Sequence, residues 1–234
     1  MNIVITGGSK GMGKALATKF AIAGNNVFIC ARDENNLSNA ALEIQKENSY
    51  AQLQYFAADI SLKPSAEEFA EWLKGQNITP DILINNAGQF IPGSIYNESD
   101  GLLEQMIAAN LYSAYHITRA LLPSMIKKKS GHIFNMCSIA SLSAYNNGGS
   151  YSISKYALMG FSKNLREELK PYNIKVTTVY PGAVYTASWE GSGIDPERIM
   201  EVNDITEMIY ASSLLSPQAC VEDIIIRPLQ GDLP

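Results

Sequence analysis

The sequence predicts an α/β protein with one doubly wound, parallel sheet of seven strands and helices on both faces. First, strand-like and helix-like runs alternate along the whole chain, which is typical of a parallel sheet covered by helices. Second, the first strand-like run enters a glycine-rich turn that opens directly into a helical pattern. Third, 234 residues, 46% of them hydrophobic, suit one large domain, which we expect to span residues 1–234.

The expected elements follow one another in a regular order. Strands are expected near 2–6, 26–31, 52–57, 81–85, 131–137, 174–180 and 222–227. Helices are expected near 11–24, 33–48, 64–75, 100–128, 150–170 and 203–214. Right-handed crossovers then predict the strand order 3-2-1-4-5-6, with the seventh strand at the edge beyond the sixth. The segment 183–202, which contains glycines and a proline, is expected to be a long irregular lid loop over a substrate.

Charge and apolar pattern argue against two classes of partner. The net charge is −5, and the basic run at 127–129 is typical of a solvated helix end, so no nucleic-acid partner is expected. No apolar run reaches about 18 residues, so no membrane span is expected. The N-terminus enters the first strand without the pattern of a signal peptide.

The cysteines and histidines favour a reduced protein without a metal. Cys30, Cys137 and Cys220 are an odd set without a C-x-x-C pair, which indicates reduced side chains in a cytoplasmic protein. His116 and His132 are far apart and lack neighbours of the metal-ligating type, so no metal site is expected.

The turn after the first strand is a candidate diphosphate site. Glycines let the backbone approach a bound group closely, and the free N–H groups of the following helix favour negative charge. The spacing here is G-x-x-x-G-x-G, and a turn that merely closes a strand–helix unit also favours glycine. The candidate cofactor-binding residues of this turn are Thr6, Gly7, Ser9, Lys10, Gly11, Met12 and Gly13.

The end of the second strand predicts NADP(H) rather than NAD(H). A carboxylate at this point of a dinucleotide fold binds the ribose 2′-hydroxyl, whereas an arginine suits a 2′-phosphate. The strand ends in Ala31 and Arg32 follows, while Lys10 can reach the same region. Asp33 is the complication, and we interpret it as the N-cap of the next helix rather than as a ribose ligand.

Two further strand ends carry candidate cofactor contacts. Asp59 and Ile60 follow the third strand, where the carboxylate could accept from an adenine amino group or simply cap a turn. The fourth strand ends in Asn85 and then Asn86, Ala87 and Gly88, at the edge where open α/β sheets bind ligands. An ordinary turn of the Asn-Gly type remains the alternative.

The candidate catalytic residues follow the fifth strand. That strand delivers Ser138 to the carboxyl edge of the sheet, and Tyr151 starts a helix with Lys155 one turn further along the same face. Lowering a tyrosine pKa from ~10 to ~7 requires ~4 kcal/mol, at 1.36 kcal/mol per unit. One ammonium ~4 Å away, at an effective dielectric constant of ~20, supplies about that much. The serine hydroxyl can donate to the developing oxyanion of a carbonyl group.

Taken in this order, the motifs resemble the short-chain dehydrogenase/reductase family over nearly the whole chain. They are Thr6-Gly7-x-x-x-Gly11-x-Gly13, Asn85-Asn86-Ala87-Gly88, Asn110, Ser138, Tyr151-x-x-x-Lys155 and Pro181-Gly182. The resemblance implies that Tyr151 is the acid/base, that Ser138 polarises the carbonyl, and that Lys155 lowers the tyrosine pKa and holds the nicotinamide ribose. It also implies that Asn110 supports a water-linked proton path through a distortion of its helix.

The resemblance extends to the cofactor and to assembly. It implies that Pro181, Gly182, Val184 and Thr186 lie along the nicotinamide, and that Lys10 and Arg32 belong to an NADP-preferring pattern. A homodimer or homotetramer is implied, with the helices at 100–128 and 150–170 packed against their copies. The apolar residues that could form this contact are Leu111, Leu121, Leu122, Leu158, Met159 and Phe161.

The C-terminal third resembles bacterial members of the sepiapterin-reductase type. The resemblance rests on residues 181–186, on Trp189 and on residues 224–232, and it implies a bicyclic pterin or another diketo substrate. Ser138, Tyr145, Tyr185 and Trp189 are the candidate substrate contacts, although aromatic residues in lids often only pack. The alternatives are a generic carbonyl or 3-oxoacyl reductase and, from another class, a catalytically silent dinucleotide-sensing scaffold on the same fold.

Overall fold

The computed structural model describes residues 1–48, 51–186, 189 and 193–233. Within these residues seven parallel strands form one sheet in the order β3-β2-β1-β4-β5-β6-β7, which confirms the predicted class and topology. The strands are β1 (Asn2–Thr6), β2 (Asn26–Ala31), β3 (Gln52–Ala57), β4 (Ile82–Asn85), β5 (Gly131–Met136), β6 (Ile174–Pro181) and β7 (Asp223–Ile226).

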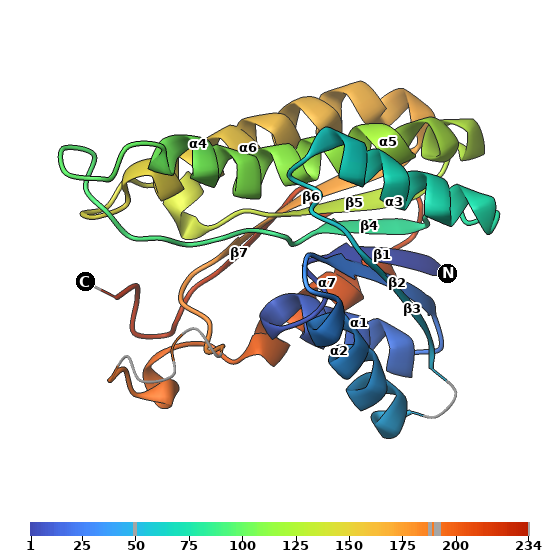
Figure 1. Ribbon diagram of the computed structural model, residues 1–234, viewed down its shortest axis with the longest axis horizontal. Coiled ribbons are helices and arrows are strands. Elements are labelled where there is room, and N and C mark those ends of the chain that lie inside the picture. The colour runs from blue at the N-terminus through green and yellow to red at the C-terminus, as the bar shows by residue number, and fades with distance from the viewer. Residues whose placement is uncertain (49–50, 187–188, 190–192, 234) are drawn as a thin grey trace.

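Helices cover both faces of the sheet (Figure 1). One layer contains α1 (Gly11–Ile22), α2 (Glu34–Glu47) and α7 (Val202–Ser213). The other contains α3 (Lys63–Gly75), α4 (Leu102–Ile107), α5 (Ser113–Lys128) and α6 (Gly149–Leu169). None of the helices in the described residues is long and apolar enough to span a membrane.

The buried strand β1 shows why both faces must be covered. Side chains of a strand alternate between the two faces of its sheet. Accordingly Ile3 and Ile5 belong to the core cluster under α1 and α7, whereas Val4 belongs to the cluster under α3 and α5. All three side chains are fully buried, as expected for a parallel strand in the middle of a doubly covered sheet.

The helix expected at 100–128 is not continuous. Helix α4 ends at Ile107, a π-helical turn occupies Ala108–Tyr112, and α5 begins at Ser113. A π turn inserts an extra residue into the helical ladder and is frequent at functional sites. Asn110, which is fully buried, lies in this turn. The helix distortion implied by the family resemblance is therefore present at this residue.

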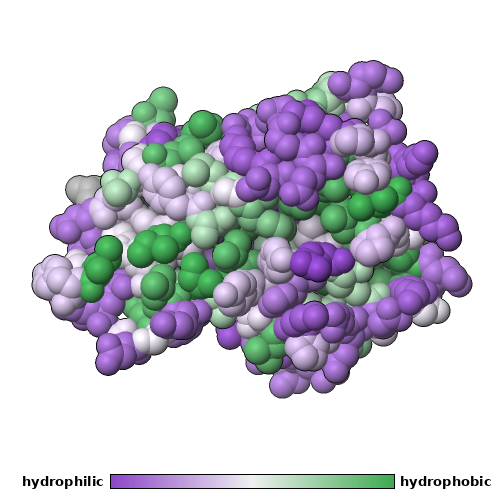
Figure 2. All heavy atoms as spheres, turned by 90° about the horizontal axis from the view of Figure 1, so that it is seen from above, coloured by the Kyte–Doolittle hydropathy of each residue, from purple (hydrophilic) through white to green (hydrophobic). Residues whose placement is uncertain are grey.

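The outer face of α4, α5 and α6 exposes large apolar and aromatic side chains, and Figure 2 shows apolar patches between polar ones on this face. The exposed residues are Leu103, Tyr112, Tyr115, Ile153 and Tyr156. Two of the residues suggested above for contact between copies, Leu121 and Leu158, are instead buried within the chain. They cannot contribute to an interface, because their side chains already fill the core.

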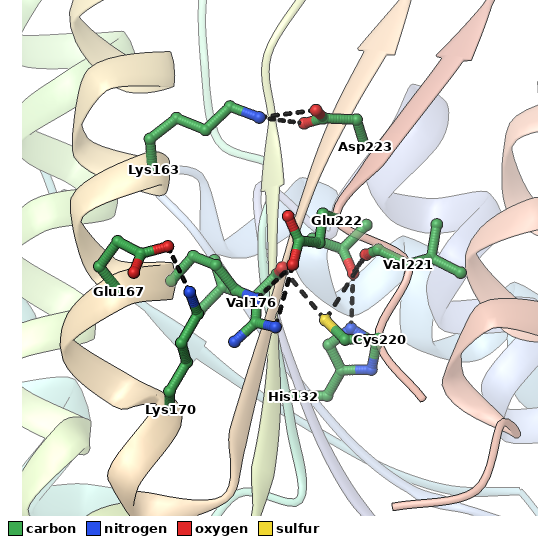
Figure 3. Close-up of polar contacts among 11 residues, drawn as sticks. His132, Lys163, Glu167, Lys170, Val176, Cys220, Val221, Glu222 and Asp223 are labelled. Atoms are coloured by element: carbon green, nitrogen blue, oxygen red, sulfur yellow. Dashed lines mark hydrogen bonds and ion pairs between the residues drawn. The ribbon is translucent and has the colours of Figure 1, made fainter. Parts of the chain in front are cut away.

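The edge strand β7 is tied to α6 by ion pairs (Figure 3). The ammonium of Lys163 lies 2.6 Å from the carboxylate of Asp223, and Arg166 lies 3.0 Å from Glu222. Beneath this edge, the Nε2 atom of His132 lies 2.7 Å from the hydroxyl oxygen of Thr177. The two ion pairs thus help to hold the last strand at the edge of the sheet, beside β6.

Candidate functional site

The turn after β1 has the shape of an anion cradle. Gly7 and Gly11 adopt positive φ angles of 66° and 54°, which side chains disfavour. A Cβ on Gly13 would lie 2.1 Å from the carbonyl oxygen of Gly7, so the helix can approach the turn only with glycine there. The N-terminus of α1 has no side-chain cap and no acidic residue in its first turn. Its N–H groups and its dipole therefore suit a bound diphosphate.

Asn86, which directly follows β4, has a structural role. The Asn86 side chain donates to the carbonyl oxygens of Thr6 at 2.9 Å and of Gly7 at 3.2 Å. The Thr6 hydroxyl in turn accepts from the backbone N–H groups of Asn86 and Ala87, at 3.0 and 2.9 Å. These two predicted cofactor contacts, Thr6 and Asn86, thus brace the glycine turn with their side chains.

The carboxylates that follow β2 and β3 act as caps. Asp33 accepts from the backbone N–H of Asn36 at 2.8 Å and is the N-cap of α2, as the sequence indicated. Asp59 accepts from the backbone N–H and the hydroxyl of Ser61, at 3.1 and 2.6 Å. The side chain of Ile60 is buried in the core, so only its backbone can face a ligand. Lys10 and Arg32 are both exposed, at the ends of the turn and of β2.

Tyr151, Lys155 and Ser138 meet at the carboxyl end of β5. Tyr151 lies in the first turn of α6, and the Lys155 ammonium lies 5.8 Å from the centroid of its ring. The Ser138 hydroxyl is a hydrogen-bond partner of the Tyr151 phenol and also accepts from the backbone N–H of Ala140 at 3.2 Å. The sequence-based grouping of these three residues is therefore a spatial one.

Burial is the main influence on the pKa of Tyr151. Burial raises the pKa of the phenol to about 12, and the hydrogen bond to Ser138 offsets only part of this effect. Burial also lowers the pKa of Lys155, whose ammonium donates to the carbonyl oxygen of Met136 at 2.8 Å. Desolvation is thus the largest cause of the shift of the tyrosine pKa, and the lowering by Lys155 stays a prediction.

Asn110 connects the π turn to α6, the helix that carries Tyr151. Its side-chain N–H group donates to the hydroxyl of Ser154 at 2.8 Å and to the carbonyl oxygen of Gln89 at 3.0 Å. Its carbonyl oxygen accepts from the backbone N–H of Gln89 at 2.7 Å. A Cβ on Gly88 would lie 2.7 Å from that oxygen and 3.5 Å from the Lys155 ammonium, so Gly88 allows this close packing.

The segment after β6 returns to the glycine turn. A Cβ on Gly11 would lie 3.7 Å from the Thr186 methyl group, which places Thr186 beside the predicted diphosphate site. Val184 is buried and pairs with Met200, while the Tyr185 N–H donates to the Met200 carbonyl at 2.8 Å. The backbone N–H of Trp189 donates to the carbonyl oxygen of Thr186 at 2.9 Å. Positions 187–188 and 190–192 of the predicted lid lie outside the described residues.

Several residues near the site escaped the sequence analysis. The ring of Phe90 meets the ring of Tyr151 edge to face, with centroids 4.8 Å apart and an interplanar angle of 75°. Gln89 and Ser154 form hydrogen bonds with Asn110, and Met136 accepts one from Lys155. Only Ser154 had a local signal, because it lies one helical turn from Tyr151. The tyrosine proposed as a substrate contact, Tyr145, is exposed near the start of α6.

Comparisons with known proteins agree with this geometry. A family profile described as short chain dehydrogenase matches residues 1–196. The chain belongs to the short-chain dehydrogenase family. It is accordingly an oxidoreductase, and the relatives that follow are similar members.

A sepiapterin reductase of Chlorobaculum tepidum is 28% identical over 239 residues, which cover 99% of this chain and 97% of that protein. A metagenomic short-chain oxidoreductase solved in complex with NADP superposes with a TM-score of 0.83 at 28% identity, covering 97% of this chain and 96% of that one. A betaketoacyl-[ACP] reductase of Bacteroides thetaiotaomicron superposes with a TM-score of 0.85 at 29% identity, covering 98% of this chain and 97% of that one.

Proposed function

We propose that this short-chain dehydrogenase reduces a ketone or other carbonyl with NADP(H), or oxidises the corresponding alcohol, with Tyr151 as the acid/base. One observation carries the proposal: the structure brings Tyr151, Ser138 and Lys155 together at the carboxyl end of β5, with the Lys155 ammonium 5.8 Å from the centroid of the Tyr151 ring. Such a cluster can hold a carbonyl oxygen and give it a proton, as the reduction of a ketone requires.

The residues of the turn fit a dinucleotide cofactor. The positive φ angles of Gly7 and Gly11, together with the uncapped start of α1, support a diphosphate there. Arg32 and Lys10 are proposed to bind the 2′-phosphate, and Thr186 to contact the nicotinamide end. The cofactor supplies or accepts the hydride.

The residues around the carbonyl have separate roles in this proposal. Tyr151, with its pKa raised to about 12, is protonated at neutral pH and can act as the acid in the reductive direction. Ser138 orients the carbonyl oxygen by donating to it. Lys155 holds the cofactor's ribose, and Asn110 aligns α6 through its bond to Ser154.

We propose a neutral, flat diketo compound such as a pterin as substrate. The segments 89–101 and 139–149, which border Tyr151, contain no lysine or arginine. A carboxylate or phosphate on the substrate would therefore lack a cationic partner from these segments. Phe90 and Tyr145 supply aromatic surface on this side, and Tyr185 and Trp189 are proposed to do so from the lid. The second candidate is 3-oxoacyl reduction, named for the Bacteroides neighbour.

The test is an NADPH-oxidation screen of pterins, diketones, quinones and acyl thioesters, followed by Tyr151→Phe with the best substrate. Loss of the phenolic proton should lower kcat by about 10²–10⁴-fold, the usual contribution of a positioned acid. Ser138→Ala should lower it by about 10²–10³-fold, the contribution of one oxyanion donor. A Tyr151→Phe variant that keeps most of the turnover contradicts the mechanism. Tight NADPH binding without turnover of any carbonyl supports the dinucleotide-sensing scaffold instead.

A further inference from the structure

Glu98 joins the two segments that border Tyr151. It lies between β4 and α4, 52 positions before Ser150 in the chain. One of its carboxylate oxygens accepts from the backbone N–H of Ser150 at 2.8 Å, and the other accepts from the Ser150 hydroxyl. Ser150 is fully buried and directly precedes Tyr151 in the first turn of α6. The carboxylate thus holds the end of the helix that carries the proposed acid.

Helix α6 has no cap of its own. Its N-cap residue, Gly148, makes no side-chain cap, and its first turn contains no acidic residue. The first N–H groups of a helix need acceptors, and its dipole favours negative charge at this end. Glu98 meets both requirements from a distant part of the chain, where sequence analysis had no local pattern to find.

Two glycines leave the space that Glu98 occupies. A Cβ on Gly149 would lie 1.8 Å from a Glu98 carboxylate oxygen, and a Cβ on Gly93 would lie 2.9 Å from the Glu98 Cγ atom. Two further bonds join the same segments: the Gly93 N–H donates to the Asn147 carbonyl at 3.0 Å, and the Ser94 hydroxyl donates to the Asn147 side chain at 2.6 Å. The carboxylate is therefore part of a built connection between the segments.

Phe90 belongs to the loop that this connection holds. The loop is held at one end by the bonds between Gln89 and Asn110, and at the other end by Glu98. Phe90 lies between these two points, with 53% of its surface exposed and its ring 4.8 Å from that of Tyr151. Because the core does not enclose Phe90, its contact with Tyr151 depends on how the loop is anchored.

We propose that Glu98 is a positioning residue for the reaction. It fixes loop 89–98 on the start of α6, and this keeps the ring of Phe90 against the ring of Tyr151 beside the substrate carbonyl. The inference rests on the proposed function, since it assigns Glu98 a role through Tyr151. Glu98 itself contacts neither substrate nor cofactor in this proposal.

The test compares Glu98→Ala with Glu98→Gln and with the control Glu104→Ala, an exposed carboxylate on α4. Loss of a charge-assisted hydrogen-bond acceptor changes an equilibrium or a rate by about tenfold to a hundredfold. We expect kcat/KM to fall by that factor in Glu98→Ala, mostly because KM rises. Glu98→Gln should stay within about threefold, because its amide can still accept from the Ser150 N–H and donate to the Ser150 hydroxyl. NADPH affinity should be unchanged in all three variants, as should kcat/KM in Glu104→Ala.

Hydrogen exchange gives a readout that does not need a substrate. Amides of residues 89–98 and 149–152 should exchange faster in Glu98→Ala than in the wild type. If Glu98→Ala does not fold, Ser150→Ala removes one of the two bonds and should show the same effects at smaller size. Unchanged exchange, or unchanged kcat/KM in a well-folded variant, overturns the inference. A wild-type protein without turnover of any carbonyl overturns the proposed function instead, and faster exchange in the variant then leaves only a structural connection.

Discussion

The ammonium of Lys155 donates to the carbonyl oxygen of Met136 at 2.8 Å and lies 5.8 Å from the ring centroid of Tyr151. The backbone at the end of β5 thus binds the ammonium of Lys155. Burial is the main influence on the pKa of the neighbouring Tyr151 phenol and raises it to about 12. The sequence pattern alone does not distinguish placing Lys155 beside Tyr151 from lowering the pKa of the tyrosine. In the structure the lysine lies beside the ring, while burial raises the tyrosine pKa.

The first prediction concerns the titration of Tyr151 without cofactor. A phenol with a pKa of about 12 is mostly protonated at every pH below that value, so little phenolate from Tyr151 should form below about pH 10. Lys155→Met should leave this titration nearly unmoved, because burial is the larger cause. An ultraviolet difference titration of the wild type against Tyr151→Phe measures it. A phenolate forming near pH 7 in the wild type, lost in Lys155→Met, would restore the original expectation.

The second prediction concerns cofactor choice. Arg32→Ala should weaken NADPH binding about tenfold to a hundredfold and leave NADH binding unchanged, because only the 2′-phosphate loses a charge-assisted partner. Asp33→Ala should lower the free energy of unfolding by about 1 kcal/mol through loss of the α2 N-cap, without changing the NADPH/NADH ratio. Dissociation constants for both cofactors decide the matter. A large change in NADH affinity for Asp33→Ala would mean that Asp33 binds the ribose.

The sequence sufficed for the fold because its signals are local. The alternation of Ile3, Val4 and Ile5 between two cores is set by the period of a strand, and the seven strands appear where such runs were expected. The role of Asp33 as the N-cap of α2 could be predicted for the same reason, since an N-cap depends on residues within one turn.

Contacts between distant residues explain what was missed. The bond from Glu98 to Ser150 spans 52 positions, and Asn110 reaches Ser154 across 44. Neither pair has a spacing that a helix or strand repeat would reveal. The π turn at Asn110 was expected only through family resemblance. The hydrogen bond from the Lys155 ammonium to the carbonyl oxygen of Met136 could not be predicted either, because a residue of any type supplies a backbone carbonyl.

The third prediction concerns assembly through α5 and α6. We propose a twofold-symmetric contact through the exposed face that includes Tyr112, Tyr115 and Tyr156, since exposed aromatic clusters mark association surfaces. Tyr156→Glu should convert the oligomer to a monomer by light scattering at micromolar concentration, because the contact would bury an unpaired charge. Tyr172→Glu, an equally exposed tyrosine beyond the end of α6, is the control. A monomeric wild type refutes the proposal.

The fourth prediction concerns stability in mild acid. Burial lowers the pKa of His132 to about 3, well below the ordinary value of about 6.5 that applies in the unfolded chain. Between these values the unfolded state binds the additional proton, so the free energy of unfolding falls as the pH falls from about 6.5 toward 3. From pH 7 to pH 5 this single group should remove about 2 kcal/mol, at 1.36 kcal/mol per unit. His132→Gln has no proton to bind and can keep a bond to Thr177, so its urea unfolding should lose correspondingly less stability over that range. Parallel losses in the two proteins would mean that His132 is not the group responsible.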